Sequence, residues 1–216
     1  MHSLPRRGRY GAPSMDTGRY IALEGAEGAG KSTHAARLAT HLGAVLTRET
    51  GGTDIGLRIR AILHDTSLTH LSHRAEALLT AADRAQHIDE VVAPALSAGR
   101  HVVSDRSVYS TIAYQGYGRG LPIDEIRQIN DWAMHSWWPD LVVLIDAPPE
   151  LLERRMRGRQ FDRFEREGDD FHRRVRDGFR TMAAADPRHW VVIDGAASLD
   201  EVGTNIRRAV TDRLKL

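Results

Sequence analysis

The chain has 216 residues, 41% of them hydrophobic, a composition typical of a folded domain that excludes collagen-like, fibrous and largely disordered proteins. Lys and Arg number 30 against 29 Asp and Glu; the net charge of +1 gives no general attraction for nucleic acid or anionic lipid, so we expect neither as a partner. The absence of cysteine excludes disulfide frameworks and thiol nucleophiles and fits the reducing cytoplasm, and no apolar run approaches the roughly 20 residues of a membrane span.

Residues 1–18 are predicted to form a disordered N-terminal extension. They show no apolar periodicity and contain Gly, Pro and three Arg. They also lack the apolar stretch of a signal peptide, and Pro5 and Pro13 argue against an amphipathic transit helix. Met15 is an alternative to Met1 as the start of translation. We expect residues 19–216 to form a single domain.

Short apolar runs alternate with longer helix-like segments through the rest of the chain. The runs are rich in Val, Ile and Leu at consecutive positions, which is typical of strands buried on both faces. The pattern predicts an α/β fold with a five-stranded parallel sheet and helices on both faces. We expect the strands at 20–24, 44–48, 101–105, 141–146 and 190–194. The segment 74–97 is predicted to be an amphipathic helix with an apolar stripe of Ala75, Leu78, Leu79, Ala82, Ala85 and Ile88.

The first expected strand leads into a glycine-rich loop, residues 25–32, that fits G-x-x-x-x-G-K-[ST] and precedes a helix-like segment. Its glycines let successive backbone N–H groups surround a polyphosphate at the positive end of the helix. Lys31, one of only two lysines in the chain, would reach the β- and γ-phosphates, and Ser32 would supply an oxygen to Mg²⁺. The sequence therefore predicts an ATP-binding P-loop that consists of Gly25, Ala26, Glu27, Gly28, Ala29, Gly30, Lys31, Ser32 and Thr33.

Glu27 is unusual within this loop because a carboxylate repels phosphate. It either accepts a hydrogen bond from a sugar hydroxyl or faces solvent.

Asp105 and Arg106 place opposite charges at the end of the third expected strand. Asp105 could hold Mg²⁺ or its water shell, and Arg106 could bridge two phosphates. The alternative is an ion pair at the surface.

An arginine-rich segment begins near residue 153, with ten Arg and seven acidic residues in 153–180. Gly158 interrupts it, and we interpret residues 153–168 as a lid that closes over the transferring phosphate. Arg154, Arg159 and Arg163 are the predicted catalytic residues of this lid, and Lys31, Asp105 and Arg106 are the predicted catalytic residues outside it. The alternative is a solvated helical face of paired charges.

Several motifs, in order, resemble the bacterial thymidylate kinases, a family of P-loop kinases, over nearly all of the chain after residue 18. They are LEGAEGAGKST (23–33), TRETGGT (47–53), LLTAADRAQH (78–87), DRSVYSTIAYQGYGRGL (105–121), PDLVVLIDAPPE (139–150) and FDRFE (161–165). Two positions depart from the family pattern. Thr50 stands where the family has Pro, and Thr80 stands where the family has a Phe that stacks on thymine.

The resemblance implies a homodimeric enzyme that transfers the γ-phosphoryl group of ATP to dTMP and yields dTDP for dTTP biosynthesis, with Mg²⁺ as cofactor. It also implies a role for each matching residue. Glu27 would lie near the acceptor sugar, Arg48 and Arg106 would contact phosphate, and Arg84 would face the base. The remaining members of the implied nucleoside and phosphate sites are Thr80, Asp105, Ser110, Thr111, Tyr114 and Gln115. The alternatives are a related kinase with another nucleoside monophosphate or deoxynucleoside acceptor, or a nucleotide-binding module without turnover.

Overall fold

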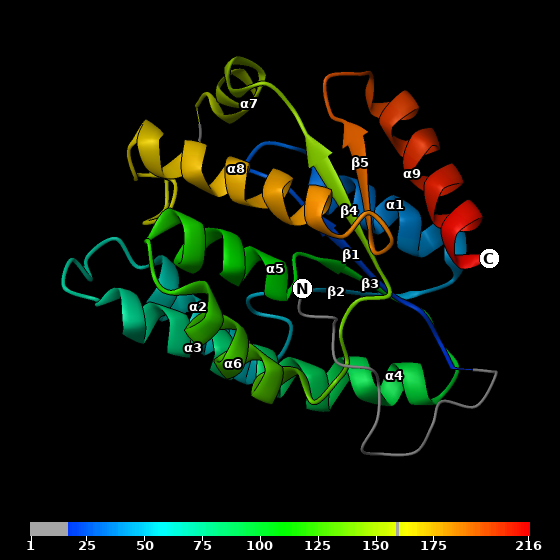
Figure 1. The fold of residues 1–216 in the computed structure, drawn as a ribbon, viewed down its shortest axis with the longest axis horizontal. Helices are drawn as coiled ribbons and strands as arrows, with labels where there is room; N and C mark the ends of the chain where they lie inside the picture. Colours follow the sequence, from blue (N-terminus) through cyan, green and yellow to red (C-terminus); the bar gives the residue numbers. More distant parts are fainter. Residues whose placement is uncertain (1–16, 159) are drawn as a thin grey trace.

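The computed structural model describes residues 17–158 and 160–216, and within them five parallel strands form one sheet with helices packed on both faces (Figure 1). The spatial order is β2-β3-β1-β4-β5. The predicted α/β class is confirmed, and each predicted strand agrees with the structure to within one residue at its ends. The strands are β1 (Tyr20–Glu24), β2 (Val45–Arg48), β3 (Val102–Asp105), β4 (Leu141–Asp146) and β5 (Trp190–Asp194).

The helices divide between the two faces of the sheet. On one face, α1 (Lys31–Leu42) and α9 (Leu199–Leu214) bury their apolar sides. The helix α7 (Pro149–Met156) follows β4, and its last turn contains the first residues of the predicted lid. The other face is covered by α2 (Asp54–His64), α3 (His73–His87), η1 (Ile88–Val92), α4 (Ala93–Ser97), α5 (Val108–Thr111), η2 (Ile112–Gly118), α6 (Ile123–Met134) and α8 (Asp169–Ala185).

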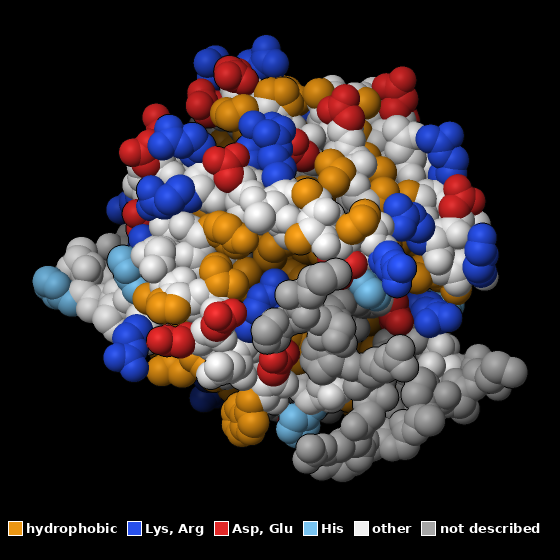
Figure 2. All heavy atoms as spheres, in the orientation of Figure 1, with side chains coloured by type: hydrophobic (Ala, Val, Ile, Leu, Met, Phe, Trp, Pro, Cys, Tyr) orange, Lys and Arg blue, Asp and Glu red, His pale blue; other side chains and the backbone are white. Residues whose placement is uncertain are grey.

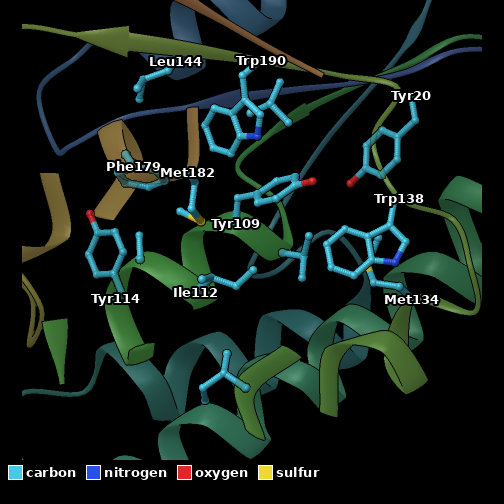
Figure 3. Packing of buried hydrophobic residues seen from close by; sticks show 14 of the residues in the cluster. Tyr20, Tyr109, Ile112, Tyr114, Met134, Trp138, Leu144, Phe179, Met182 and Trp190 are labelled. Carbon is cyan, nitrogen blue, oxygen red and sulfur yellow. The ribbon is translucent and has the colours of Figure 1, made fainter. Parts of the chain in front are cut away.

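Alternation along the strands supplies both cores, because successive side chains of a strand point to opposite faces. In β1, Ile21 and Leu23 pack toward α1 and α9, whereas Tyr20 packs into the larger core on the other face. Figure 3 shows part of this larger core, where Tyr109 makes edge contacts with Trp138 and Trp190 at centroid distances of 5.7 and 4.8 Å. The sheet is therefore buried on both faces, as its continuous apolar strands predicted.

The segment predicted as one helix at 74–97 is helical throughout, but it contains the π-helical turn η1 between α3 and α4. Pro94 follows this turn, and a proline ring inside a helix clashes with the carbonyl four residues earlier. The wider π turn accommodates the ring.

The apolar stripe predicted for this segment is buried only in part, which corrects the sequence-based interpretation of α3: Ile88 is fully buried and Leu79 packs against the core, whereas other members of the stripe face solvent. Leu78 is 55% exposed, and Ala82 is also exposed. The buried side is mostly polar, because its side chains bond to one another and to neighbouring elements. Its members are Glu76, Ala77, Thr80, Ala81, Asp83, Arg84 and His87.

The packed part of the domain begins one residue earlier than predicted, at Gly18 rather than at residue 19. The predicted extension, residues 1–18, lies outside the described residues as far as residue 16. Gly18 is buried, and its N–H donates a hydrogen bond to the Leu96 carbonyl at 3.1 Å.

Charges of both signs share the surface. Figure 2 shows Lys and Arg side chains interspersed with Asp and Glu on the face that it draws. None of the helices in the described part of the chain is long and apolar enough to cross a bilayer.

The sheet brings the predicted functional residues to one edge. In the parallel register Leu23 of β1 lies beside Asp105 of β3, and Arg48 of β2 lies on the other side of Asp105. The residues that follow β1, β2 and β3 therefore meet at the carboxyl edge of the sheet, where ligands of open parallel sheets bind.

Candidate active site

A cavity of about 520 Å³ opens at this carboxyl edge. Its walls come from the loop after β1, the β2–α2 connection, α3, the segment after β3 and the predicted lid. The structure brings most of the sequence-predicted residues together here: Glu27, Gly28, Gly30, Lys31, Ser32, Thr33, Arg48, Thr80, Arg84, Asp105, Arg106, Ser110, Thr111, Tyr114 and Gln115.

The glycine-rich loop wraps the start of α1. Gly28 and Gly30 have φ angles of 78° and 90°, in the left-handed region that favours glycine, and Gly30 caps the helix. Lys31 is almost fully buried and donates from Nζ to the Ala26 carbonyl at 2.8 Å. Burial and the neighbouring Arg106 lower the pKa of Lys31 to about 8. A buried cation whose charged form is disfavoured gains most when an anion arrives.

Ser32 and Asp105 meet beside the loop, where the Ser32 hydroxyl donates to Asp105 Oδ2. A hydroxyl and a carboxylate are the hard oxygen ligands that Mg²⁺ prefers, and Mg²⁺ is usually held by one or two such side chains with substrate phosphates and waters. This pair therefore fits the predicted metal.

Arg106 is held in a strained position at the tip of β3. Its φ angle of 74° is in the left-handed region, uncommon for a non-glycine residue. Its guanidinium donates to the Ser110 hydroxyl at 3.0 Å and the Gly25 carbonyl at 3.3 Å. It also forms an ion pair with Glu27 and donates to the Tyr114 hydroxyl at 3.2 Å.

Glu27 is thus paired with Arg106. Burial alone would raise the pKa of Glu27, but Arg106 and Lys31 outweigh it and lower the pKa to about 2. The carboxylate stays ionised at physiological pH and offsets the cations of the cavity.

Glu24, the last residue of β1, is a positioning residue that sequence reasoning missed. It is fully buried and accepts hydrogen bonds from the Ser107 N–H and hydroxyl, both at 2.8 Å, and from the Ser110 hydroxyl at 2.7 Å. Burial raises its pKa. Glu24 ties the turn that carries Arg106 to the sheet. A charged residue that ends an otherwise apolar strand was the available signal.

Arg84 forms the floor of the opposite end of the cavity. Its Nε donates to Glu49 Oε2 at 2.9 Å and its Nη2 to the Thr111 hydroxyl at 3.0 Å, while Nη1 donates to Asn130 Oδ1. His87 donates to the other oxygen of Glu49 at 2.9 Å. These bonds fix the guanidinium plane. Glu49 and Asn130 were not predicted as its partners.

Arg60 is a further cation at the cavity that the sequence did not single out. It lies on α2 and its Nη1 is within 3.4 Å of the Thr50 carbonyl. Burial and Arg48 lower its pKa. With Arg48 and Arg106 it makes a cationic wall.

The segment predicted as a lid contributes Arg155, Gln160, Asp162, Phe164 and Glu165 to the lining of the cavity. Asp162 accepts from His64 Nδ1 at 2.6 Å, which attaches the lid to the end of α2.

The predicted lid arginines have different surroundings. Arg163 donates to the Leu63 carbonyl at 2.9 Å and pairs with Glu76 at 2.6 Å. Arg154 is exposed outside the cavity lining, and Arg159 lies outside the described residues. Arg155 does line the cavity, and it donates to the Gly195 carbonyl at 3.1 Å.

Comparisons with known proteins agree with this geometry. The family model described as thymidylate kinase matches residues 23–206. The thymidylate kinase of Oleidesulfovibrio alaskensis is 44% identical over 206 residues, covering 89% of this chain and 97% of the relative. That of Chromobacterium violaceum is 47% identical over 195 residues, covering 88% and 92%. The crystal structure of thymidylate kinase from Ehrlichia chaffeensis superposes with a TM-score of 0.75 at 30% identity, covering 90% and 99%.

Asp83 supports the β2–α2 loop through a hydrogen bond to its backbone. It is fully buried on α3, and its Oδ1 accepts the Gly51 N–H at 2.9 Å, while Oδ2 has no hydrogen-bond partner among the residues described. Burial and Glu49 raise its pKa from 3.8 to about 6. When folding raises the pKa of an acid, the folded state holds the proton more tightly than the unfolded state. The resulting stabilisation is lost as the pH rises from the pKa of the unfolded state through the pKa of the folded state.

We therefore expect wild-type protein to lose stability relative to Asp83→Asn between pH 5 and pH 8, by about 1 kcal/mol. The amide retains an oxygen for the Gly51 N–H but carries no charge. Urea unfolding of both proteins at the two pH values measures this difference. The exposed Asp200→Asn serves as the control. A difference between wild type and Asp83→Asn that does not change with pH contradicts the raised pKa.

Proposed function

The chain belongs to the thymidylate kinase family, and on this premise we propose that the cavity at the carboxyl edge of the sheet performs the family's reaction with the residues described above. The activity is the transfer of the γ-phosphoryl group of ATP to dTMP, which yields dTDP. The observation that carries the assignment to this cavity is its division into two halves, a P-loop at one end and the fixed Arg84 at the other.

The donor half is formed by the P-loop. Backbone N–H groups of the loop and the start of α1 would surround the β- and γ-phosphates, and Lys31 would exchange the Ala26 carbonyl for a phosphate oxygen. Ser32 and Asp105 would hold Mg²⁺, which supplies positive charge to the phosphate oxygens when bound.

The acceptor half is formed by the cationic wall and the floor. Arg48, Arg60 and Arg106 would bind the 5′-phosphate of dTMP. The phosphate would replace Glu27 as the partner of Arg106, and the Glu27 carboxylate would then turn to the sugar. Arg84, Thr111, Tyr114 and Gln115 would surround the base. Thr80 supplies no ring here, and its hydroxyl is already bonded to the Ala77 carbonyl at 2.8 Å.

Transfer then requires no covalent intermediate with the protein. An oxygen of the acceptor phosphate attacks the γ-phosphorus of ATP. The bond between the γ-phosphorus and the β–γ bridging oxygen breaks, and its electron pair leaves with ADP. Lys31, Arg106 and arginines of the lid hold the groups in line and neutralise the charge on the equatorial oxygens. Arg154, Arg159 and Arg163 remain the predicted lid arginines, and Arg155 joins them because it lines the cavity.

We also propose that two copies of the chain associate through α2, α3 and α6, which pack side by side. Each presents a large hydrophobic side chain to solvent: Leu57 and Leu78 are half exposed, and Trp132 is 75% exposed. Contact between two copies through these helices would remove the apolar side chains from water. A cytoplasmic location fits the absence of cysteine.

The phosphate role of Lys31 predicts that Lys31→Met lowers kcat at least 100-fold while the fold is retained, because a preorganised charge at the transferring phosphate is lost. ADP release with dTMP, dUMP, dCMP, dGMP and thymidine as acceptors measures the activity, and circular dichroism measures the fold. Lys215→Met, at the exposed C-terminus, is the matched control and should match wild type. The proposal fails if folded Lys31→Met turns over at the wild-type rate, or if dTMP is not the preferred acceptor.

The dimer predicts a sedimentation mass near twice 24.1 kDa at micromolar concentration. Leu78→Glu should reduce it to the monomer mass, because a charge would be buried without a partner. Val192→Glu, at a half-exposed position on β5, should leave the mass unchanged. A monomeric wild-type protein would rule out the dimer.

A further inference from the structure

Glu76 is a buried carboxylate beside the acceptor half of the cavity, and none of the steps above uses it. It lies on α3 and is fully inaccessible to solvent. Its Oε1 accepts Gln115 Nε2 at 2.8 Å and Arg119 Nε at 3.2 Å, and its Oε2 accepts Arg119 Nη2 at 3.2 Å. Arg163 of the lid pairs with the same Oε2 at 2.6 Å.

Two arginines keep this carboxyl group ionised. Burial alone would raise the pKa of Glu76, but its hydrogen bonds from Arg119 and Gln115 and the charge of Arg163 outweigh burial and lower the pKa. An ionised carboxylate has no proton and can only accept hydrogen bonds. Whatever group of Gln115 meets Glu76 must therefore be a donor.

This requirement determines which way the Gln115 amide points. A glutamine amide has a donor end and an acceptor end, and a 180° flip exchanges them. With the NH₂ group committed to Glu76, the carbonyl oxygen is left for the cavity, which Gln115 lines. Gln115 is only 2% exposed, and the hydrogen bonds among residues 17–158 and 160–216 include none to this oxygen.

We propose that Glu76 is a positioning residue that presents the carbonyl oxygen of Gln115 to the acceptor base and thereby selects a base with an N–H group at its pairing edge. The inference rests on the proposed function, in which Gln115 is beside the base. Thymine has an N3–H donor that this oxygen would accept. Cytosine has a lone pair at N3, which would face the lone pairs of the Gln115 oxygen and leave both groups unpaired.

The selection matters because Thr80 supplies no stacking surface at this end of the cavity. Hydrogen bonding then carries a larger share of base recognition. A site that is built to receive a donor rejects analogues that lack it far more strongly than an apolar pocket distinguishes shapes.

The test compares dTMP with 5-methyl-dCMP, which keeps the methyl group but replaces the N3–H with a lone pair and the neighbouring 4-carbonyl with an amino group. In Glu76→Gln the side chain at 76 gains a donor, so the Gln115 amide is free to flip. We expect kcat/KM for dTMP to fall about tenfold, mainly through KM. The ratio of kcat/KM for dTMP to that for 5-methyl-dCMP should fall at least tenfold.

Glu167→Gln is the matched control. Glu167 also accepts from Arg119, at 2.5 Å, but has no contact with Gln115. It should leave the ratio within twofold of wild type. A ratio in folded Glu76→Gln equal to that of wild type overturns the proposal, since a merely structural role would affect both substrates alike.

The exchange variant Glu76→Gln with Gln115→Glu covers the case in which the single variant does not fold. There the amide at 76 donates to the carboxylate at 115, whose second oxygen still accepts the base N–H. Retained preference for dTMP supports the proposal, and a lost preference in the folded protein overturns it. If wild type itself does not phosphorylate dTMP, the proposed function fails rather than the role of Glu76.

Discussion

The pairing of Arg106 with Glu27 is the interaction on which the rest of the site depends. Arg106, Lys31 and Arg60 converge on one partly enclosed cavity, and cations in such a place repel one another strongly. Glu27 neutralises the cation at the centre, and Glu24 anchors the turn behind it through Ser107 and Ser110. Burial, followed by the charge of Arg106, still lowers the pKa of Lys31. The site is therefore suited to anions that complete it, and the phosphates of two nucleotides provide them.

The same principle explains the unusual burial of α3. Its buried side carries Glu76, Asp83, Arg84 and His87, each of which has a hydrogen bond to another element. Helices normally bury apolar stripes, but here the inward side lines the cavity through Thr80 and Arg84 and carries their supports. The small Ala77 and Ala81 share this buried side, whereas the larger Leu78 is exposed to solvent. One helix thus carries residues of both the proposed acceptor site and the proposed contact between copies.

Much of the fold and part of the site follow from the sequence alone. Strands buried on both faces are recognisable as apolar runs, and the P-loop has fixed spacing because its chemistry is local. The supports Glu24, Glu49, Glu76 and Asn130 were missed because their hydrogen-bond partners at the cavity are 35 to 86 residues away in the sequence, and no local pattern encodes such a bond. The orientation of α3 was misjudged for a related reason. Periodicity counts apolar residues, whereas mutual hydrogen bonding decided which side of this helix is buried.

The most direct measurement is the single-turnover rate of phosphoryl transfer from ATP to dTMP in wild type and in Arg106→Met. In this account the positive charge of Arg106 is needed at the transferring phosphate, and Glu27 only holds Arg106 in place before the nucleotides bind. It therefore predicts a rate at least 100-fold lower, with a native circular dichroism spectrum. A folded Arg106→Met that transfers phosphate within threefold of the wild-type rate would contradict it.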